Sequence, residues 1–460
     1  MVGIWEVLDR AINTGPVMSS TEFDTKVFET ATKLAKEHDI KYDPASPLPS
    51  DDGILDRIFE AGLNLYTEVG TYCMSTERVI KFSEAEIKDG LRDVSSEIEI
   101  GDGLEKRKLF QRKTEDQRTP LYLGGLIESN PQEGEIFVKL YQSIAQEKIV
   151  DGFYFGPPHT IEGKLARFGS PLEAHAHRCA CMWVREALRR AGRPGLHLLS
   201  ASPSAAGEMS GCNPEDGVRK SDAITVAVTS ELKTDYVLLM KVVHSLRYGC
   251  TRNAFWTPCI GGFAGGPESA VVVSIADALQ AVMVYQIRMT GYVNPASTSI
   301  RVLANSARNQ QWMRNSAIQA LQKKTNLIVC GGSMTSAGPG TEQHLLECAL
   351  STIGVIASGG HIAHGIRKAK VVKRNQGSGL EVRFQAEVAR AVAGLKRKDA
   401  NDIETELLKR VETNLDPDKA PEGKGFEELY DLGSLTPKKE YLETYNSVKK
   451  ELQEIGIPVQ

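Results

Sequence analysis

Between about residues 119 and 395 the chain alternates short apolar runs with longer helical patterns, and this rhythm constrains the fold most. In the longer stretches apolar residues recur every three or four positions, as in a helix with one buried face. The short runs predict eight buried strands, at residues 121–125, 152–155, 196–199, 223–228, 255–260, 299–303, 327–330 and 362–365. Eight strand–helix steps favour an α/β fold of the (β/α)8 TIM-barrel type over an open sheet.

The segments on either side of this alternation differ from it in composition. Residues 1–115 are polar and helical in pattern, and residues 396–460 are charged and helical, with a Pro/Asp/Lys/Gly-rich linker at 417–425. We therefore expect an N-terminal helical region over 1–115, a barrel over 116–395 and a C-terminal helical tail over 396–460.

The charge balance and the cysteine content exclude several classes of protein. Lys and Arg number 55 against 59 Asp and Glu, with no long run of one sign, so no nucleic-acid or membrane-binding arm is expected. No apolar run approaches membrane-spanning length, and residues 1–15 lack the apolar core of a secretory signal. The 8 scattered cysteines are expected to be reduced thiols in a cytoplasmic protein.

Aromatic residues lie at the ends of two predicted strands, where barrel enzymes place their reactive groups. Tyr154 and Phe155 end the second strand, and Phe255 and Trp256 lie just before the glycine-rich run at 261–266. Rings from several strand ends can form a cage for a cationic or methylated ligand. Filling of the core by aromatic side chains explains the same residues at least as well.

Cysteine and histidine residues offer two metal sites, both weak. The His/Cys alternation at 175–181 lies inside one continuous helix pattern, which predicts ordinary packing. A zinc ion bound near the strand ends would draw on Cys212, Cys259 and Cys330, although cysteine is also a common small core residue.

Glycine-rich loops are a third candidate feature. The run at 261–266 lacks the Lys-Ser/Thr ending of a P-loop. The glycine pairs at 331–332 and 359–360 suit tight turns, or a phosphate group held by backbone amides at the barrel mouth.

Motifs spread over nearly the whole chain resemble one family. They are AGRPG at 191–195, SAAGEMS at 204–210, PCIGGFAGG at 258–266, AGPGTE at 337–342 and EVARAVAG at 387–394. They look like the corresponding stretches of the monomethylamine methyltransferases of methanogens, which carry pyrrolysine. The resemblance implies a homo-oligomeric (β/α)8 barrel without a tightly bound cofactor, which passes a methyl group from an amine to the cobalt of a separate corrinoid (cobalamin) protein.

The catalytic residues that this resemblance would supply have no counterparts here. Counted from AGRPG, the position of pyrrolysine falls on Leu199. The family's acidic residue ahead of the glycine loop falls on Phe255, and a second family glutamate falls near Thr225. The polar pair that contacts the pyrrolysine ring falls near Gly332 and Met334. Monomethylamine is therefore rejected as the substrate.

A quaternary ammonium donor is compatible with the loss of these catalytic residues. Its nitrogen already carries the charge that lets it leave as a neutral amine. Its pocket needs aromatic faces and one carboxylate. Glu208 is the candidate counter-charge, and His159 and His197 are weaker candidates for polar contacts. The prediction is a pyrrolysine-free methyltransferase that moves methyl from a quaternary or otherwise activated methylated amine to Co(I) of a corrinoid protein.

Three alternatives stay open at this point. A zinc-dependent enzyme for a methylated thiol or an O-methyl donor would use Cys212, Cys259, Cys330 and His197. A barrel that has lost catalysis would survive as a binding protein. An enzyme for a phosphorylated metabolite rests on the glycine pairs alone.

Overall fold

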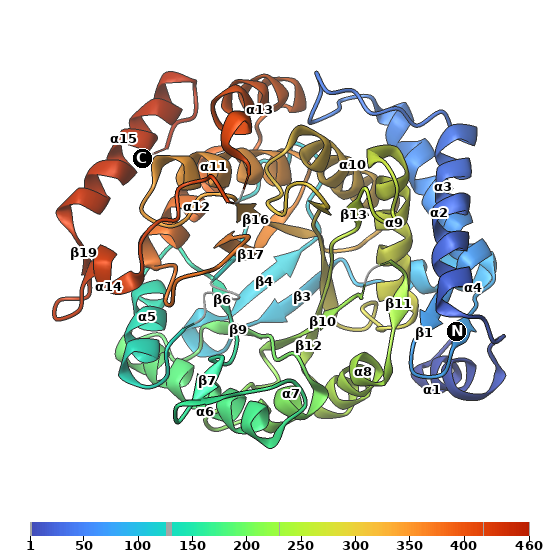
Figure 1. The fold of residues 1–460 in the computed structure, drawn as a ribbon, viewed down its shortest axis with the longest axis horizontal. Coiled ribbons are helices and arrows are strands. Elements are labelled where there is room, and N and C mark those ends of the chain that lie inside the picture. Colours follow the sequence, from blue (N-terminus) through green and yellow to red (C-terminus); the bar gives the residue numbers. More distant parts are fainter. Residues whose placement is uncertain (1, 126–130, 230, 417, 460) are drawn as a thin grey trace.

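Eight parallel strands close into a barrel within the residues that the computed structural model describes, 2–125, 131–229, 231–416 and 418–459 (Figure 1). Around the ring they are β5 (Tyr122–Leu123), β6 (Gly152–Phe155), β9 (His197–Ser200), β10 (Ala223–Ala227), β12 (Thr251–Trp256), β14 (Gly291–Pro295), β16 (Cys330–Thr335) and β17 (His361–Lys368). The Val293 amide donates to Ile328 O at 3.0 Å where β14 meets β16, and the Asp151 amide donates to Tyr122 O at 2.9 Å where β6 meets β5. The predicted (β/α)8 barrel is confirmed.

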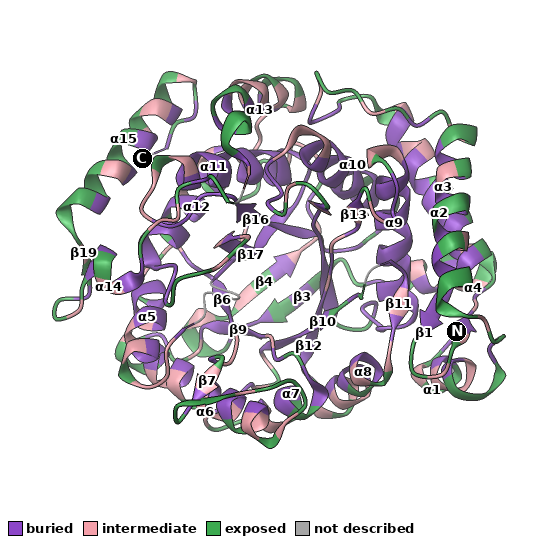
Figure 2. Cartoon of the chain, viewed as in Figure 1, coloured by how far each residue is buried: buried purple, intermediate pink, exposed green. Residues whose placement is uncertain are grey.

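A ring of helices surrounds the strands. It consists of α5 (Glu135–Ala145), α6 (Pro171–Arg190), α8 (Tyr236–Tyr248), α9 (Pro267–Met283), α10 (Arg308–Lys324), α11 (Glu342–Ala357) and α12 (Gly379–Ala391). Helices α9 and α11 are buried on almost every side (Figure 2). An outer layer explains this, because α2 (Ser20–Glu37) and α3 (Asp52–Val69) pack on α9 and α13 (Arg397–Val411) packs on α11.

Three of the eight barrel strands lie at other residues than the sequence predicts. The runs at 255–260, 299–303 and 327–330 differ from the barrel strands β12, β14 and β16. These strands read TRNAFW, GYVNP and CGGSMT, so asparagine, arginine and glycine interrupt the apolar run that a buried parallel strand normally shows. The interior near the mouth is polar. Strands that line it therefore lack the apolar run by which a buried strand is predicted from sequence.

A β-hairpin closes one end of the barrel. Its strands are β3 (Glu97–Ile100) and β4 (Arg107–Phe110), which lie across the centre of the ring in Figure 1. Ile98, Ile100 and Leu109 pack against the interior residues Leu123 and Leu199. The hairpin belongs to residues 1–115, so this region helps to complete the barrel core; the three-part division of the chain stays a prediction.

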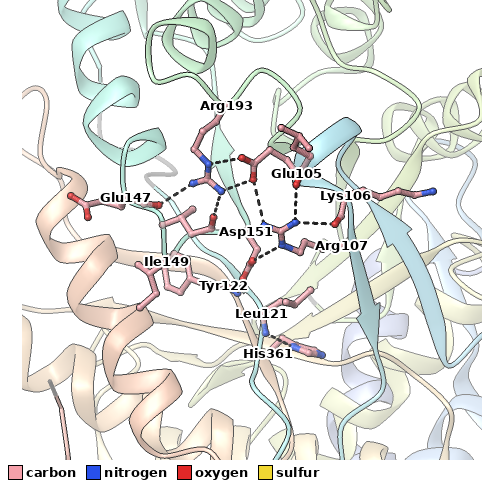
Figure 3. Close-up of polar contacts among 12 residues, drawn as sticks. Glu105, Lys106, Arg107, Leu121, Tyr122, Glu147, Ile149, Asp151, Arg193 and His361 are labelled. Atoms are coloured by element: carbon pink, nitrogen blue, oxygen red, sulfur yellow. Dashed lines mark hydrogen bonds and ion pairs between the residues drawn. The ribbon is translucent and has the colours of Figure 1, made fainter.

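The AGRPG motif fastens this hairpin to the barrel (Figure 3). Arg193 donates to Glu105 with Nη2 at 2.6 Å and Nε at 2.9 Å, and to Val150 O at 2.8 Å. Gly195 O accepts from the Asp102 amide at 2.8 Å, and a Cβ on Gly195 would lie 2.1 Å from Asp102 O. The arginine and the second glycine are therefore required by the close approach of two chain segments.

His361 joins the same hairpin to the first and last barrel strands (Figure 3). Its Nδ1 accepts from the Leu121 amide at 2.9 Å, and its Nε2 contacts Phe110 O at 2.6 Å. A neutral imidazole satisfies both contacts, accepting at Nδ1 and donating from Nε2. Burial lowers the pKa of His361 to about 3, so the ring is neutral at physiological pH.

We expect His361 to make the fold acid-sensitive. Because its pKa is lower in the folded chain than the unfolded value of about 6.5, its contribution to stability is present above pH 6.5 and is lost as the pH falls toward 3. The free energy of unfolding should fall by up to about 1.4 kcal/mol per pH unit from this group between pH 6 and 4. Urea unfolding of the wild type and of His361→Phe checks this, since the variant should be less stable at pH 7 but flatter with pH. Equal slopes would contradict it.

Candidate functional site

A cavity of about 300 Å³ lies at the carboxyl ends of the barrel strands. Loops after parallel strands meet at this end, where barrel enzymes hold their substrates. Most of the lining is small or apolar. The side chains that can stack or hydrogen-bond there are His159, Thr225, Lys241, Phe255, His364 and Arg367.

Phe255 and His364 form a stacked pair in this lining. Their ring centroids are 4.0 Å apart and their planes differ by 17°. The ring of Tyr154 lies 4.2 Å from His364. Burial lowers the pKa of His364 to about 3, so the cavity presents a neutral imidazole beside a phenyl ring.

The backbone of His364 is strained, and the glycine pair at 331–332 allows this. His364 has φ +60°, and the pairing of β16 with β17 shifts register between Gly331 and Ser333. A Cβ on Gly332 would lie 2.5 Å from His364 O, so only glycine permits the approach. Strained non-glycine residues at strand irregularities are common in functional sites. The sequence carried no signal for His364 beyond the two glycines.

Glu208 lies behind the cavity wall and does not line it. Its carboxylate is fully buried and accepts from Ser200 Oγ and from the Ser202 amide, the latter at 3.0 Å. Lys241 Nζ is 3.8 Å away and donates to Ser202 O. Glu208 therefore offsets the charge of Lys241, which does reach the cavity and which the sequence did not single out.

Of the four predicted cage aromatics, only Phe255 faces the cavity. Trp256 is 1% exposed and its Nε1 donates to Ser274 Oγ at 2.9 Å on α9, outside the barrel. Phe155 stacks on His177 of α6. Tyr154 lies inside the barrel, below the cavity. Successive residues of a strand point to opposite faces, so two adjacent aromatics cannot both line the mouth.

The remaining predicted residues are dispersed. His159 and Thr225 line the cavity. His197, at the start of β9, is buried at the other end of the strand with Nδ1 2.8 Å from Ser221 O. Met334 Sδ lies 2.7 Å from Arg367 Nη2, beside the cavity.

Leu199 occupies the barrel interior and is completely buried. It belongs to one interior cluster with Tyr154 and Ala223 of the neighbouring strands β6 and β10 and with Tyr292 of β14. An aliphatic side chain in this setting has neither a nucleophile nor an imine. Leu199 can shape the core but cannot form a covalent adduct.

The predicted zinc ligands do not converge. Cys330 is in the barrel core, Cys259 is on β13 (Cys259–Ile260), and Cys212 follows α7 (Ala205–Gly211) with its Sγ 3.6 Å from Glu208 O. Among the described residues, no three His, Cys, Asp or Glu side chains lie close enough to hold a metal ion. The zinc set therefore has no geometric support.

The glycine pairs also do not form a phosphate site. Gly332 is in the middle of β16, packed on β17. Gly359 precedes β17, and a Cβ on it would lie 2.7 Å from the Lys113 carbonyl carbon, at the end of the barrel opposite the cavity. The glycines serve close packing instead.

Comparison with known proteins gives one consistent result. Residues 2–457 match the family model described as "Monomethylamine methyltransferase MtmB". Monomethylamine methyltransferase MtmB2 of Methanosarcina acetivorans is 30% identical over 459 residues, 98% of each chain. MtmB of Methanosarcina mazei is 29% identical over 456 residues, again 98% of each chain. The crystal structure of the Methanosarcina barkeri enzyme superposes with a TM-score of 0.92 at 28% identity, covering 99% of this chain and 98% of that one.

One further property concerns the length and apolar character of the helices. Across the ranges given above, none of them combines the length and apolar character needed to cross a membrane.

Proposed function

Because this chain belongs to the monomethylamine methyltransferase MtmB family, we propose that it works without pyrrolysine and takes its methyl group from an amine that is already activated. The acceptor is Co(I) of a separate corrinoid protein, as the family resemblance implies. A quaternary ammonium is the donor class that suits the site best. The homo-oligomeric state and the cytoplasmic location remain predictions.

Leu199 carries this proposal. At the position that matches pyrrolysine the chain has a buried leucine, packed in the barrel core. A primary amine is a poor leaving group, and the neutral imidazole of His364 is too weak an acid to protonate it at physiological pH. A quaternary nitrogen needs neither an adduct nor an acid. As the C–N bond breaks, its electron pair stays on nitrogen, and the methyl group joins Co(I) as methyl-Co(III).

The cavity wall offers a cationic donor one ring face, and of the two cationic side chains in its lining, Lys241 and Arg367, the first has a carboxylate beside it. Phe255 offers a π surface that attracts a methylated cation. Lys241 would repel such a cation, but the Glu208 carboxylate lies 3.8 Å from its ammonium group and offsets it. Glu208 acts here through Lys241 and not by direct contact.

Exposed apolar side chains surround the same end of the barrel and support docking of the corrinoid protein there. Phe168 is 65% exposed, Phe263 51% and Ile300 66%, each on a loop that follows a barrel strand. Apolar groups gathered at one face are typical of surfaces that bind another protein. A corrinoid seated here would bring its cobalt to the mouth of the cavity.

A spectroscopic assay tests the proposed function. The protein is mixed with a reduced corrinoid protein and separate donors: monomethylamine, tetramethylammonium, dimethyl sulfide and a methoxyarene. We expect the methyl-cobalt spectrum with tetramethylammonium and not with monomethylamine. Methylation from monomethylamine would overturn the proposal, and no methylation from any donor would favour the non-catalytic alternative.

Replacing Phe255 with alanine should raise the KM for tetramethylammonium about tenfold, because a desolvated cation–π contact contributes roughly 1–2 kcal/mol. The cobalt spectrum at increasing donor concentration measures this. Trp256→Phe is the matched control, since it removes the bond to Ser274 on the outer face and should leave KM unchanged. A larger effect from Trp256→Phe than from Phe255→Ala would contradict the assignment.

A further inference from the structure

The barrel interior beside the cavity holds polar atoms that lack hydrogen-bond partners within the described ranges. They are Asn253 Oδ1, Tyr292 OH, both amide atoms of Asn294, and His364 Nε2. The first three residues are fully buried and His364 is 8% exposed. These four side chains are called the inner polar layer.

The side chains of the inner polar layer lie on the interior face of the barrel. Asn253 pairs in register with Tyr292, and Phe255 pairs with Asn294, on the adjacent parallel strands β12 and β14. Residues paired in this way point to the same face of a sheet. Tyr292 belongs to the interior cluster, and Asn253 donates to the hydroxyl of interior Tyr154. All four side chains therefore point inward.

The inner polar layer is also continuous with the cavity. Phe255 and His364 line the cavity as a stacked pair, and Thr225, which lines it too, pairs in register with Asn253. His364 is thus the member of the layer that lines the cavity, while Asn253 and Asn294 are fully buried and pair in register with the lining residues Thr225 and Phe255.

Four such side chains on three strands require an explanation, because buried polar groups in folded proteins almost always have partners. The set is chemically specific. Burial raises the pKa of Tyr292 and lowers the pKa of His364, so both side chains are neutral. The two asparagines carry no charge. Two amide oxygens accept, while Tyr292 and Asn294 can donate. A charged group placed among them would lose its hydration without compensation.

We infer that the inner polar layer binds an uncharged hydrogen-bonding group of the methyl donor, a hydroxyl or a carboxamide. This inference rests on the proposed function for the other half of the ligand, a quaternary nitrogen against the ring of Phe255. Together the two parts define the donor class as a quaternary ammonium with a short neutral polar arm. Ordered water is the competing occupant.

Calorimetric titration tests the donor class with three probes. Choline has a hydroxyl arm, tetramethylammonium has no arm, and glycine betaine has a carboxylate arm. We expect choline to bind wild-type protein at least tenfold more tightly than tetramethylammonium does. Tyr292→Phe and Asn294→Leu should bring the two affinities together without weakening tetramethylammonium. Equal affinities in the wild type, or tighter binding of betaine than of choline, would overturn the inference.

A second measurement does not depend on the quaternary nitrogen. Crystals of the wild type are soaked in acetamide, and we expect its amide group among Asn253, Tyr292 and Asn294. If acetamide binds there while no quaternary probe binds, the proposed function fails and the polar site stands. If the layer holds only water that acetamide does not displace, the inference fails. Tyr292→Phe should keep the wild-type Tm, because it removes only an unpartnered hydroxyl.

Discussion

Replacing Arg193 with alanine should lower the free energy of unfolding by about 3–5 kcal/mol, the range for breaking a buried ion pair. The side chains of Arg193 and Glu105 are only 10% and 15% exposed, and two hydrogen bonds join them. The guanidinium also donates to the carbonyls of Ala145, Glu147 and Val150, at 3.2, 3.0 and 2.8 Å. The variant leaves three carbonyls without this donor and leaves the Glu105 carboxylate with its longer ion pair to Arg107, at 3.7 Å, and it loosens the hairpin that closes the barrel.

Urea unfolding measures this loss, and Arg189→Ala is the matched control. Arg189 lies in the last turn of α6, four residues before Arg193, and pairs with Glu186, but its side chain is 69% exposed, so its removal should leave the free energy of unfolding almost unchanged. Arg193→Lys should fall between the two, because an ammonium group cannot reproduce the paired contacts of the guanidinium. Similar losses for Arg189→Ala and Arg193→Ala would show that the hairpin contact is not a principal stabilising feature.

Leu199→Ala should lower the free energy of unfolding by about 2–5 kcal/mol, because it opens a void in the barrel interior. Leu199 is wholly buried among rings and aliphatic groups, including those of Tyr154 and Tyr292. Leu199→Met preserves the volume and should lose less than about 1.5 kcal/mol. Unfolding of both variants in denaturant checks that Leu199→Ala loses more stability than Leu199→Met.

The same pair of variants separates packing from chemistry. If Leu199 serves only the core, Leu199→Met should methylate cobalt at the wild-type rate with the donor that the wild type accepts. A loss of turnover of more than tenfold in Leu199→Met, with its stability intact, would show that this position still acts on the substrate. That result would contradict the role we assign to it.

Elements with simple periodicity could be predicted from the sequence, and elements with a polar interior could not. The continuous helix pattern expected around 175–181 is α6, and the strand expected at 152–155 is β6, because their apolar patterns are regular. The predicted positions of β12 and β16 were wrong by several residues. Asn253 and the glycines at 331–332 face a polar or crowded interior and interrupt the apolar pattern. The position of a strand could thus not be predicted where the barrel interior is polar.

The candidate site shows the same division. Phe255, Thr225 and His159 were expected near a binding site and do line the cavity. His364 and Lys241 were missed, because a strained backbone at a strand irregularity and a buried lysine on a helix leave no local pattern. Trp256 was grouped with its neighbour Phe255, although the strand period of two sends it to the opposite face.

The hairpin of β3 and β4 has a kinetic consequence. It fills one end of the barrel, so under the function proposed above the methyl donor and the corrinoid protein must both approach the other end. The small donor has to enter first, and the demethylated amine has to leave after the partner has withdrawn. Turnover then follows a compulsory order, and a large excess of the corrinoid protein should slow the reaction by covering an empty cavity.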